Sequence, residues 1–296
     1  KKDRCYTIAL QTVNMNQEVI IGIDLGATNI RGGLVAGKRI TATQARAIRS
    51  KGTVEEVLQD IFSIVDLLMN ESVAAIGIGV PSVVDVENGI VYDVQYIPSW
   101  KEVHLKEIME KRYAVPVFVN NDANCFALGE FYFGKGIGTD HMIGLTIGTG
   151  IGAGIIINRR LYAGPNCGAG EFGMADYLDR CYEYYGSGQF FQNVYQTDGQ
   201  VVFERAKAGD LQAQQWYAEM GTHLGNTIKL ILYAYDPPLI IFGGSVRHAY
   251  PYFQQTMWER ISGFAFSKSL PRLRIELSEL HNSGILGAAG LYYNAL

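Results

Sequence analysis

One strand–glycine turn–strand pattern occurs twice in this chain. The first copy begins Ile-Gly-Ile-Asp-Leu-Gly at Ile21, and the second begins Ile-Gly-Leu-Thr-Ile-Gly at Ile143, an offset of 122 positions. The same offset pairs Gly32 with Gly154, and a basic turn follows each copy. Two consecutive strands with glycines in register indicate a duplicated unit. Two such units facing each other would put their glycine turns on opposite walls of a cleft, where sites for small ligands form.

The remaining periodicity predicts an α/β fold, because strand-like and helix-like segments alternate. We expect two lobes, each a mixed sheet flanked by helices. The first comprises residues 19–118 plus a C-terminal helix at 284–296, and the second comprises residues 119–283. Residues 1–18 form a lead-in that is too short for a DNA-binding module. Strands are expected at 19–26, 30–35, 39–48, 73–80, 115–119 and 239–242, and helices at 53–69, 101–111, 211–233 and 284–295.

Composition excludes several classes of protein. With 48% apolar and 18% charged residues among 296, the chain is of the folded, globular type. Its 25 basic and 29 acidic residues give a net charge of −4, which provides no cationic surface for nucleic acid or an anionic membrane. No apolar run reaches the roughly 18 residues of a membrane span, and no secretory signal is evident. Four dispersed cysteines without a Cys-x-x-Cys pair indicate free thiols in a reducing cytoplasm; they are Cys5, Cys125, Cys167 and Cys181.

The two glycine turns are candidate phosphate sites. In the first, backbone N–H groups can close around an anion while a carboxylate orients hydrated Mg²⁺, although a plain hairpin with an Asx turn is the alternative. In the second, four alternating glycines weaken the strands and add nothing to a core, so a phosphate cradle accounts for them better. Neither turn has the Gly-Lys-Ser/Thr of a P-loop. The candidate residues are Asp24, Gly26, Thr28, Gly148, Thr149 and Gly150.

Carboxylates and amides supply candidates for a second set of contacts. Asn121 and Asp122 lie in a polar run, 120–124, directly after a predicted buried strand. Open α/β sheets place their chemistry at such strand ends, although these side chains could instead cap the following helix. Glu171 lies among glycines and Glu183 follows twelve residues later. Both could accept hydrogen bonds from sugar hydroxyls, whereas a lone glutamate in a glycine loop is otherwise a solvated turn residue.

Five motifs together resemble those of the ROK family, which comprises repressors, open reading frames and sugar kinases of the hexokinase/actin-like ATPase superfamily. The resemblance runs from about Val19 to Ala289, and the motifs occur in the family's order. They are Asp24-x-Gly26-x-Thr28-x-x-Arg31-x-Gly33, Asn121-Asp122-Ala123-Asn124, Gly148-Thr149-Gly150-Ile151-Gly152-x-Gly154, Gly168-x-Gly170-Glu171-x-Gly173 and Gly243-Gly244.

The resemblance implies two actin-like (ribonuclease H-like) lobes with an interdomain cleft that binds ATP, Mg²⁺ and a sugar. It implies that Asp122 is the catalytic base and that Asn121, Glu171 and Glu183 hold the sugar. The two glycine turns would hold the phosphates, with Gly243 and Gly244 on the adenosine side. It also implies a homo-oligomer, which we expect to be a dimer.

The departures from the family pattern fall on the sugar side. Met174 stands where a histidine usually contacts both the sugar and a structural zinc, and Cys181 matches only the last cysteine of the zinc loop. Ser82 replaces a glycine, and Tyr96 replaces an asparagine. Tetrahedral zinc needs four ligands, so we expect no zinc site. The identity of the sugar stays open.

The sequence therefore predicts an ATP-dependent sugar kinase that phosphorylates the primary hydroxyl of a hexose or N-acetylhexosamine. One alternative is a non-catalytic sugar sensor or transcriptional regulator of the ROK type. Another is an ATP-driven chaperone or filament of the actin superfamily, in which the Asn121–Asp122 and Gly170–Glu171 sites would have no role.

Overall fold

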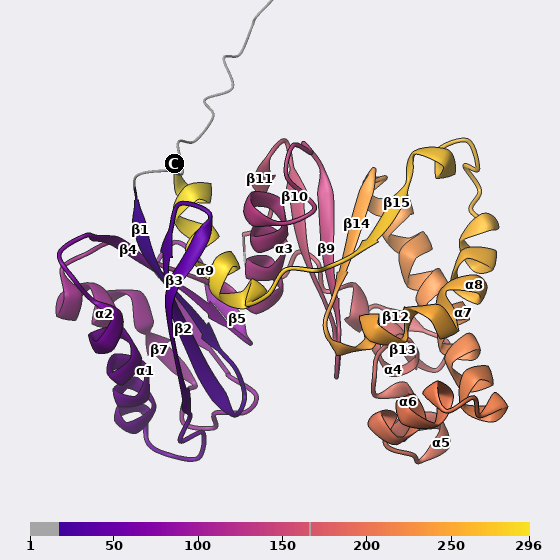
Figure 1. Ribbon diagram of the computed structural model, residues 1–296, viewed down its shortest axis with the longest axis horizontal. Helices are drawn as coiled ribbons and strands as arrows, with labels where there is room; N and C mark the ends of the chain where they lie inside the picture. Colours follow the sequence, from indigo (N-terminus) through magenta and orange to yellow (C-terminus); the bar gives the residue numbers. More distant parts are fainter. Residues whose placement is uncertain (1–17, 166) are drawn as a thin grey trace, which may run out of the picture.

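Two five-stranded mixed sheets with the same strand order form the framework of the molecule (Figure 1). The computed structural model describes residues 18–165 and 167–296, so the predicted lead-in lies almost wholly outside the described residues. The first sheet has the order β3-β2-β1-β4-β8 and the second has the order β11-β10-β9-β14-β15. In each, the first three strands are antiparallel and the last three are parallel. The strands are β1 (Val19–Leu25), β2 (Asn29–Ala36), β3 (Arg39–Ala47), β4 (Val73–Val80), β8 (Val117–Asn121), β9 (Met142–Ile147), β10 (Ile151–Ile157), β11 (Arg160–Leu161), β14 (Leu239–Gly243) and β15 (Arg274–Leu277).

The repeat in the sequence is therefore a repeat in the fold. The offset of 122 positions takes the end of β1 at Leu25 to the end of β9 at Ile147, and the start of β2 at Asn29 to the start of β10 at Ile151. Both predicted glycine turns consequently join the first two strands of a sheet. The prediction of an α/β fold built from two mixed, helix-flanked sheets is confirmed.

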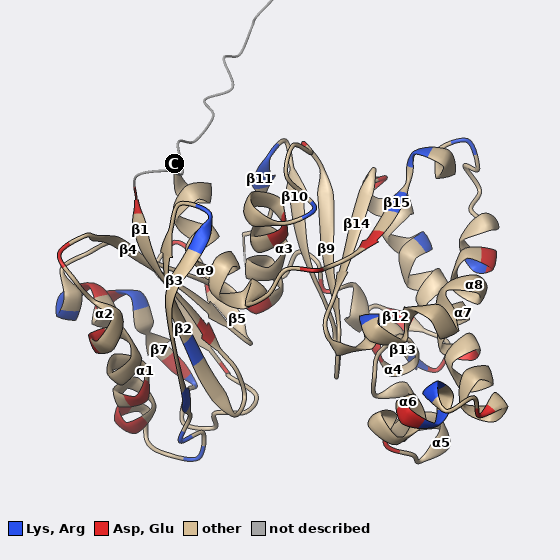
Figure 2. Cartoon of the chain, in the orientation of Figure 1, with Lys and Arg blue, Asp and Glu red and all other residues tan. Residues whose placement is uncertain are grey.

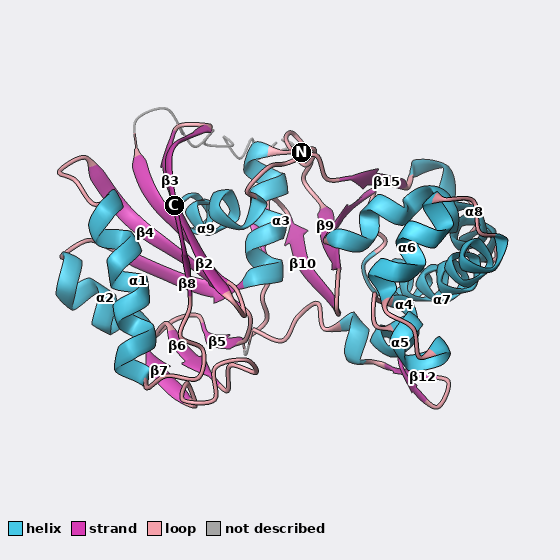
Figure 3. Ribbon diagram, turned by 60° about the horizontal axis from the view of Figure 1, so that its bottom comes forward, coloured by secondary structure: helices cyan, strands magenta, loops and turns pink. Residues whose placement is uncertain are grey.

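Helices cover both faces of each sheet. One face of the first sheet packs against α1 and α2, and one face of the second packs against α7 and α8. The other two faces are covered by α9 on the first sheet and α3 on the second, and these two helices pack against each other between the sheets (Figure 3). The helices are α1 (Val54–Leu68), α2 (Leu105–Tyr113), α3 (Asp122–Phe133), α4 (Tyr182–Gly186), α5 (Phe190–Tyr195), α6 (Gly199–Lys207), α7 (Leu211–Tyr235), α8 (Tyr250–Ser262) and α9 (Ser283–Ala295).

Glycines in the first sheet allow α9 to approach the strands closely. A Cβ on Gly22 would overlap the carbonyl oxygen of Ile285, and a Cβ on Gly77 would overlap that of Ala288. On its other side, α9 meets α3, where a Cβ on Gly287 would overlap the carbonyl of Cys125. Small residues thus bring the backbones of two strands and two helices together, although α9 follows β4 by some 200 residues in the chain.

One predicted helix begins later than expected. The helix expected at 101–111 begins only at Leu105, because Glu102–His104 forms strand β7, which pairs with β6 in a small third sheet. That sheet comprises β5 (Val83–Asp85), β6 (Ile90–Tyr92) and β7, and sequence periodicity over such short strands did not reveal it. A two-stranded ribbon, β12 (Asp176–Tyr177) and β13 (Arg180–Cys181), precedes α4. The short 3-10 turns are η1 (Phe172–Met174), η2 (Ser245–Ala249) and η3 (Leu270–Arg272).

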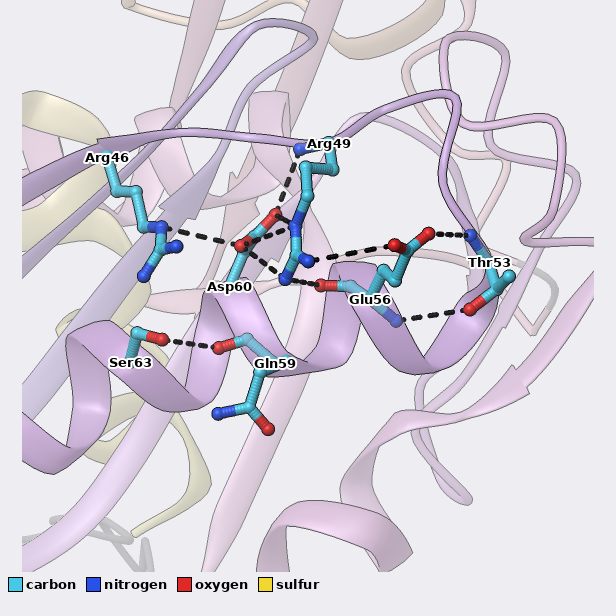
Figure 4. A network of polar contacts seen from close by, with 7 residues as sticks. All are labelled: Arg46, Arg49, Thr53, Glu56, Gln59, Asp60 and Ser63. Atoms are coloured by element: carbon cyan, nitrogen blue, oxygen red, sulfur yellow. Dashed lines mark hydrogen bonds and ion pairs between the residues drawn. The ribbon is translucent and has the colours of Figure 1, made fainter.

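A buried carboxylate anchors α1 to the segment before it (Figure 4). The side chain of Asp60 is 1% exposed and accepts hydrogen bonds from Arg49 at its backbone N–H (2.9 Å) and guanidinium (2.8 Å to Nη2), while Arg46 lies 3.4 Å away. Burial opposes ionisation of Asp60, but the bonds from Arg49 outweigh it and hold its pKa below the usual value. A capping box between Thr53 and Glu56 starts the same helix. These contacts fix α1 on the sheet that carries the first glycine turn.

Charged residues of both signs are interspersed over both sheets and their helices (Figure 2). Within residues 18–165 and 167–296, no helix combines the length and the apolar character that crossing a membrane requires. Three of the four cysteines, Cys125, Cys167 and Cys181, are described, and all three are free thiols.

Candidate active site

Asn121 and Asp122 lie where β8 passes directly into α3. Asn121 is the last residue of the strand and the N-cap of the helix, and its Oδ1 accepts the Ala123 N–H at 2.8 Å. Asp122 is the first helical residue, and its Oδ1 accepts the same N–H at 2.8 Å. The strand thus begins and ends two residues later than predicted, and the capping role belongs to Asn121. Its amide group also donates to the Ser82 carbonyl at 3.3 Å, which fixes Asn121 toward the first sheet.

The surroundings of Asp122 disfavour its ionisation. Solvent reaches the carboxylate, but dense protein around it limits its hydration. This desolvation, followed by the negative charge of Asp24 and a smaller effect of Glu171, raises the pKa of Asp122 to about 6. The hydrogen bond from Ala123 acts in the opposite direction. A carboxylate with a pKa near 6 is ionised at neutral pH yet basic enough to take a proton from a reacting hydroxyl.

Glu171 and Glu183 come from separate segments and meet on the second sheet's side. Glu171 follows Gly170, whose φ of 101° and close approach to the Ala153 carbonyl exclude a side chain. Glu183 lies in the first turn of α4, and its Oε2 accepts the Ile151 N–H at 2.8 Å. Burial and the neighbouring charge of Glu183 raise the pKa of Glu171. The two glutamates are therefore close together, and Glu183 also touches the second glycine turn.

The first glycine turn leaves two backbone donors free. Gly26 donates its N–H to the Asn29 carbonyl at 2.9 Å, which closes the turn. The N–H groups of Ala27 and Thr28 have no acceptor among the described residues. Burial raises the pKa of the adjacent Asp24, and the positive charge of Arg31 partly opposes this. Free N–H groups at a tight turn form a concave site that suits an anion.

Hydrogen bonds to the carbonyl groups of the second glycine turn hold it in place. Gly188 donates to the Gly148 carbonyl at 2.7 Å, and the Thr149 carbonyl accepts from the Ser187 hydroxyl at 2.9 Å and the Gln189 amide at 2.8 Å. The N–H of Gly148 donates to the Gly150 carbonyl, whereas those of Thr149 and Gly150 have no acceptor in the described part of the chain. Both turns therefore offer the same kind of anion site.

Gly243 and Gly244 lie beside the second turn, because β14 pairs with β9 up to Gly243 and Thr146. Gly244 has a φ of 74°, and a Cβ there would overlap the Ile147 carbonyl. Arg247 holds the turn by donating from Nη1 to the Gly244 carbonyl at 2.6 Å. This conformation favours glycine strongly, which explains the pair.

A polar pocket of about 550 Å³ lies between β1 and β2 of the first sheet, η2 and the connection to α9. Sequence motifs had singled out Asp24 and Arg31 in its lining, but not Arg247 or His281. Arg247 follows the glycine pair by three residues and could have been noticed there; His281 lies in the connection to α9, which carries no motif. The lining residues are Asp24, Arg31, Arg247, Leu280, His281, Asn282, Ser283, Gly284 and Ile285.

Two of the three residues that depart from the sequence motifs are exposed. Met174 is 61% exposed and Tyr96 is 47% exposed, so neither is a core residue. The Ser82 hydroxyl donates to the Tyr92 carbonyl. In residues 18–165 and 167–296, no three His, Cys, Asp or Glu side chains are grouped so that they could hold a metal ion.

Comparisons with known proteins identify the family to which this chain belongs. Residues 20–295 match the ROK family. A glucokinase from Thermotoga maritima is 28% identical over 92% of this chain and 96% of its own length, and a xylose repressor from Bacillus subtilis is 29% identical over 84% and 70%. A ROK family glucokinase from Streptomyces griseus, solved in complex with glucose and AMPPNP, has a TM-score of 0.76 and 28% identity over 92% of this chain and 98% of its own. The fold is thus that of the actin-like ATPases, as the motifs implied, and the chain belongs to the ROK family.

Proposed function

We propose that this protein is an ATP-dependent sugar kinase that phosphorylates the primary hydroxyl of a hexose or an N-acetylhexosamine. The observation that carries this proposal is the position of Asp122 just after β8, where Asp24 of β1 pairs with Gly79 of β4 and Gly79 pairs with Asn120 of β8. The charges of Asp24 and Glu171 both raise the pKa of Asp122. One carboxylate then adjoins both a candidate phosphate site and a candidate sugar site. The likeness to glucokinases supports the same assignment.

On the sugar side, Asp122 would take the proton from the primary hydroxyl while the hydroxyl oxygen attacks the terminal phosphorus of ATP. Asn121, Glu171 and Glu183 would hold the other hydroxyls. Glu183 keeps one oxygen on the Ile151 N–H, so its other oxygen is available for a sugar hydroxyl. The resulting bonds would hold the acceptor close to Asp122, and such positioning lowers the barrier of a transfer reaction.

On the phosphate side, the free N–H groups of the two turns would bind the ATP phosphates, with Gly243 and Gly244 beside the adenosine. The described residues contain no group of three or more His, Cys, Asp or Glu side chains that could hold a cation. This donor set suits Mg²⁺ held mainly by the nucleotide, with Asp24 contacting its hydration shell. The ion would neutralise charge on the phosphates. The bond from the sugar oxygen to phosphorus forms as the bond from phosphorus to ADP breaks, and the proton stays on Asp122.

A non-catalytic sugar sensor is the second candidate, and the likeness to a xylose repressor favours it. The kinase and the sensor would use the same sugar site, but only the kinase would transfer phosphate to the sugar. For either, we propose the lobe boundaries 19–118 plus 284–296 and 119–283, a homodimer, and a cytoplasmic location. Light scattering on the purified protein tests the dimer.

An ADP-release screen with glucose, mannose, fructose and N-acetylated hexosamines tests the proposal, with calorimetric titration of each sugar in parallel. Sugar-dependent ADP release that Asp122→Asn removes would support the kinase. Sugar binding without ADP release would favour the sensor, and ATP hydrolysis that ignores every sugar would point to a different ATPase.

A further inference from the structure

A buried cysteine joins the loop that carries Glu171 to the end of β8, which Asp122 directly follows. Cys167 follows β11 of the second sheet by a few residues, yet its side chain is 4% exposed within the hydrophobic core of the first sheet. Val84 of β5 and Trp100 belong to that core. The loop from β11 to Glu171 therefore crosses from one sheet to the core beneath the other before it presents its carboxylate.

The thiol does not merely fill space there, because it belongs to a polar cluster. The Oδ1 of Asn120 accepts three donors: the Asn121 N–H at 2.8 Å, the Asn124 amide at 2.9 Å and the Cys167 thiol at 3.3 Å. Asn120 is 2% exposed and Asn124 is 1% exposed. Buried amides destabilise a fold unless they are paired. The three bonds satisfy the Oδ1 of Asn120, whereas the Oδ1 of Asn124 has no partner among the described residues. The bonds at Asn120 therefore favour one arrangement of the segments that meet there.

The backbone of Cys167 also indicates that the loop is held in place. Its φ is 55°, a left-handed conformation that costs a residue other than glycine roughly 1 kcal/mol. Such a conformation persists where the surroundings fix it, and it occurs often at functional sites. Here Gly168 follows directly, and Glu171 lies four residues from the thiol.

We propose that Cys167 is a positioning residue for the sugar site. Its thiol, bound to Asn120, holds the loop of Glu171 in register with Asn121 and Asp122, so the two walls of the site stay aligned. Asn120 is the residue just before Asn121 and accepts its N–H, which makes the link direct. The sugar role of the site rests on the proposed function, but the anchoring of the loop does not.

Hydrogen exchange of the loop amides, residues 168–173, tests the anchor in the full chain. Cys167→Ala removes the donor and should accelerate their exchange about 3–10-fold, because one net hydrogen bond stabilises a closed state by about 0.5–1.5 kcal/mol. Cys167→Ser keeps a donor and should restore slow exchange to within about twofold of the wild type. Unchanged exchange in Cys167→Ala, or no rescue by serine, would overturn the proposal.

Sugar affinity gives the second measurement, with Cys125→Ala as the matched control. Cys125 is also buried, but its sulfur faces Gly79 of β4 and forms no bond to Asn120. Cys167→Ala should raise the Kd of the best sugar about 3–10-fold and leave the ATP Kd within about twofold, whereas Cys125→Ala should change neither by more than that. Equal effects of both alanine variants on sugar and ATP would assign Cys167 to packing alone. If the wild type binds sugar without turnover, the proposed kinase fails while this comparison still decides the role of Cys167.

Discussion

The pH dependence of phosphoryl transfer should follow the ionisation of Asp122. With its pKa raised to about 6, this carboxylate is about 90% ionised at pH 7 and about 10% ionised at pH 5. A general base acts in its ionised form, so kcat/KM should fall about tenfold per pH unit below pH 6. Asp24→Asn removes the neighbouring charge that contributes most to the shift after burial itself, so it should move this acid limb to lower pH.

Removing the base gives the complementary measurement. Asp122→Asn keeps the size of the side chain but cannot take the proton, so kcat should fall by about 10²–10⁴ while sugar affinity stays within a few-fold. Because the folded pKa of Asp122 lies above its ordinary value of 3.8, its ionisation opposes folding above that value, and the opposition is complete above about pH 6. The asparagine variant should therefore melt no lower than the wild type at pH 7.

Steady-state kinetics of both variants between pH 4.5 and 8, with the best sugar and saturating ATP, decide the question. Asp122→Asn that retains most of the wild-type kcat would remove Asp122 from catalysis. An acid limb that stays in place in Asp24→Asn would show that another group titrates.

Four further outcomes are expected. Arg49→Gln removes the main partner of Asp60 and should lower the midpoint of urea denaturation. Because the folded pKa of Asp60 lies below 3.8, this loss of stability should be complete above that pH and shrink as the pH falls further. Gly244→Ala forces a strained φ and a clash with Ile147, so it should destabilise by more than about 1 kcal/mol and raise the KM of ATP more than that of sugar. Elemental analysis should find no stoichiometric zinc, and about one zinc per chain would require ligands other than Cys181. Because Met174, Ser82 and Tyr96 together would alter the proposed sugar wall, sugars besides glucose should be accepted; efficient use of glucose alone would contradict this inference.

Much of the framework could be predicted from periodicity, because its long strands carry near-continuous apolar runs and its turns carry glycine. The strand predicted at 73–80 is β4, with the same bounds. The three-residue strands β5, β6 and β7 were not predicted, because alternation of apolar and polar residues over three positions cannot be distinguished from the pattern of a loop. Their pairing depends on contacts between segments that no local pattern encodes.

Sequence motifs likewise predicted one part of the candidate site and could not predict another. Motifs singled out Asp24, Asp122 and Glu171, since each lies at a strand end or among glycines. They could not connect Cys167 with Asn120, which is 47 positions away, or bring His281 to the pocket that Asp24 lines. Those relations arise only when the two sheets and their connecting loops are packed together.

The close packing of α9 on Gly22 and Gly77 has a consequence for biosynthesis. Ribosomes add about 5–20 residues per second, so roughly 10–40 seconds separate the appearance of β4 from that of α9. During this interval the nascent first sheet exposes the apolar face on which α9 will pack. Chaperones that bind exposed apolar strands should therefore engage this chain until α9 is made, and pulse proteolysis should find the first sheet protected only after residues 283–295 can pack on it.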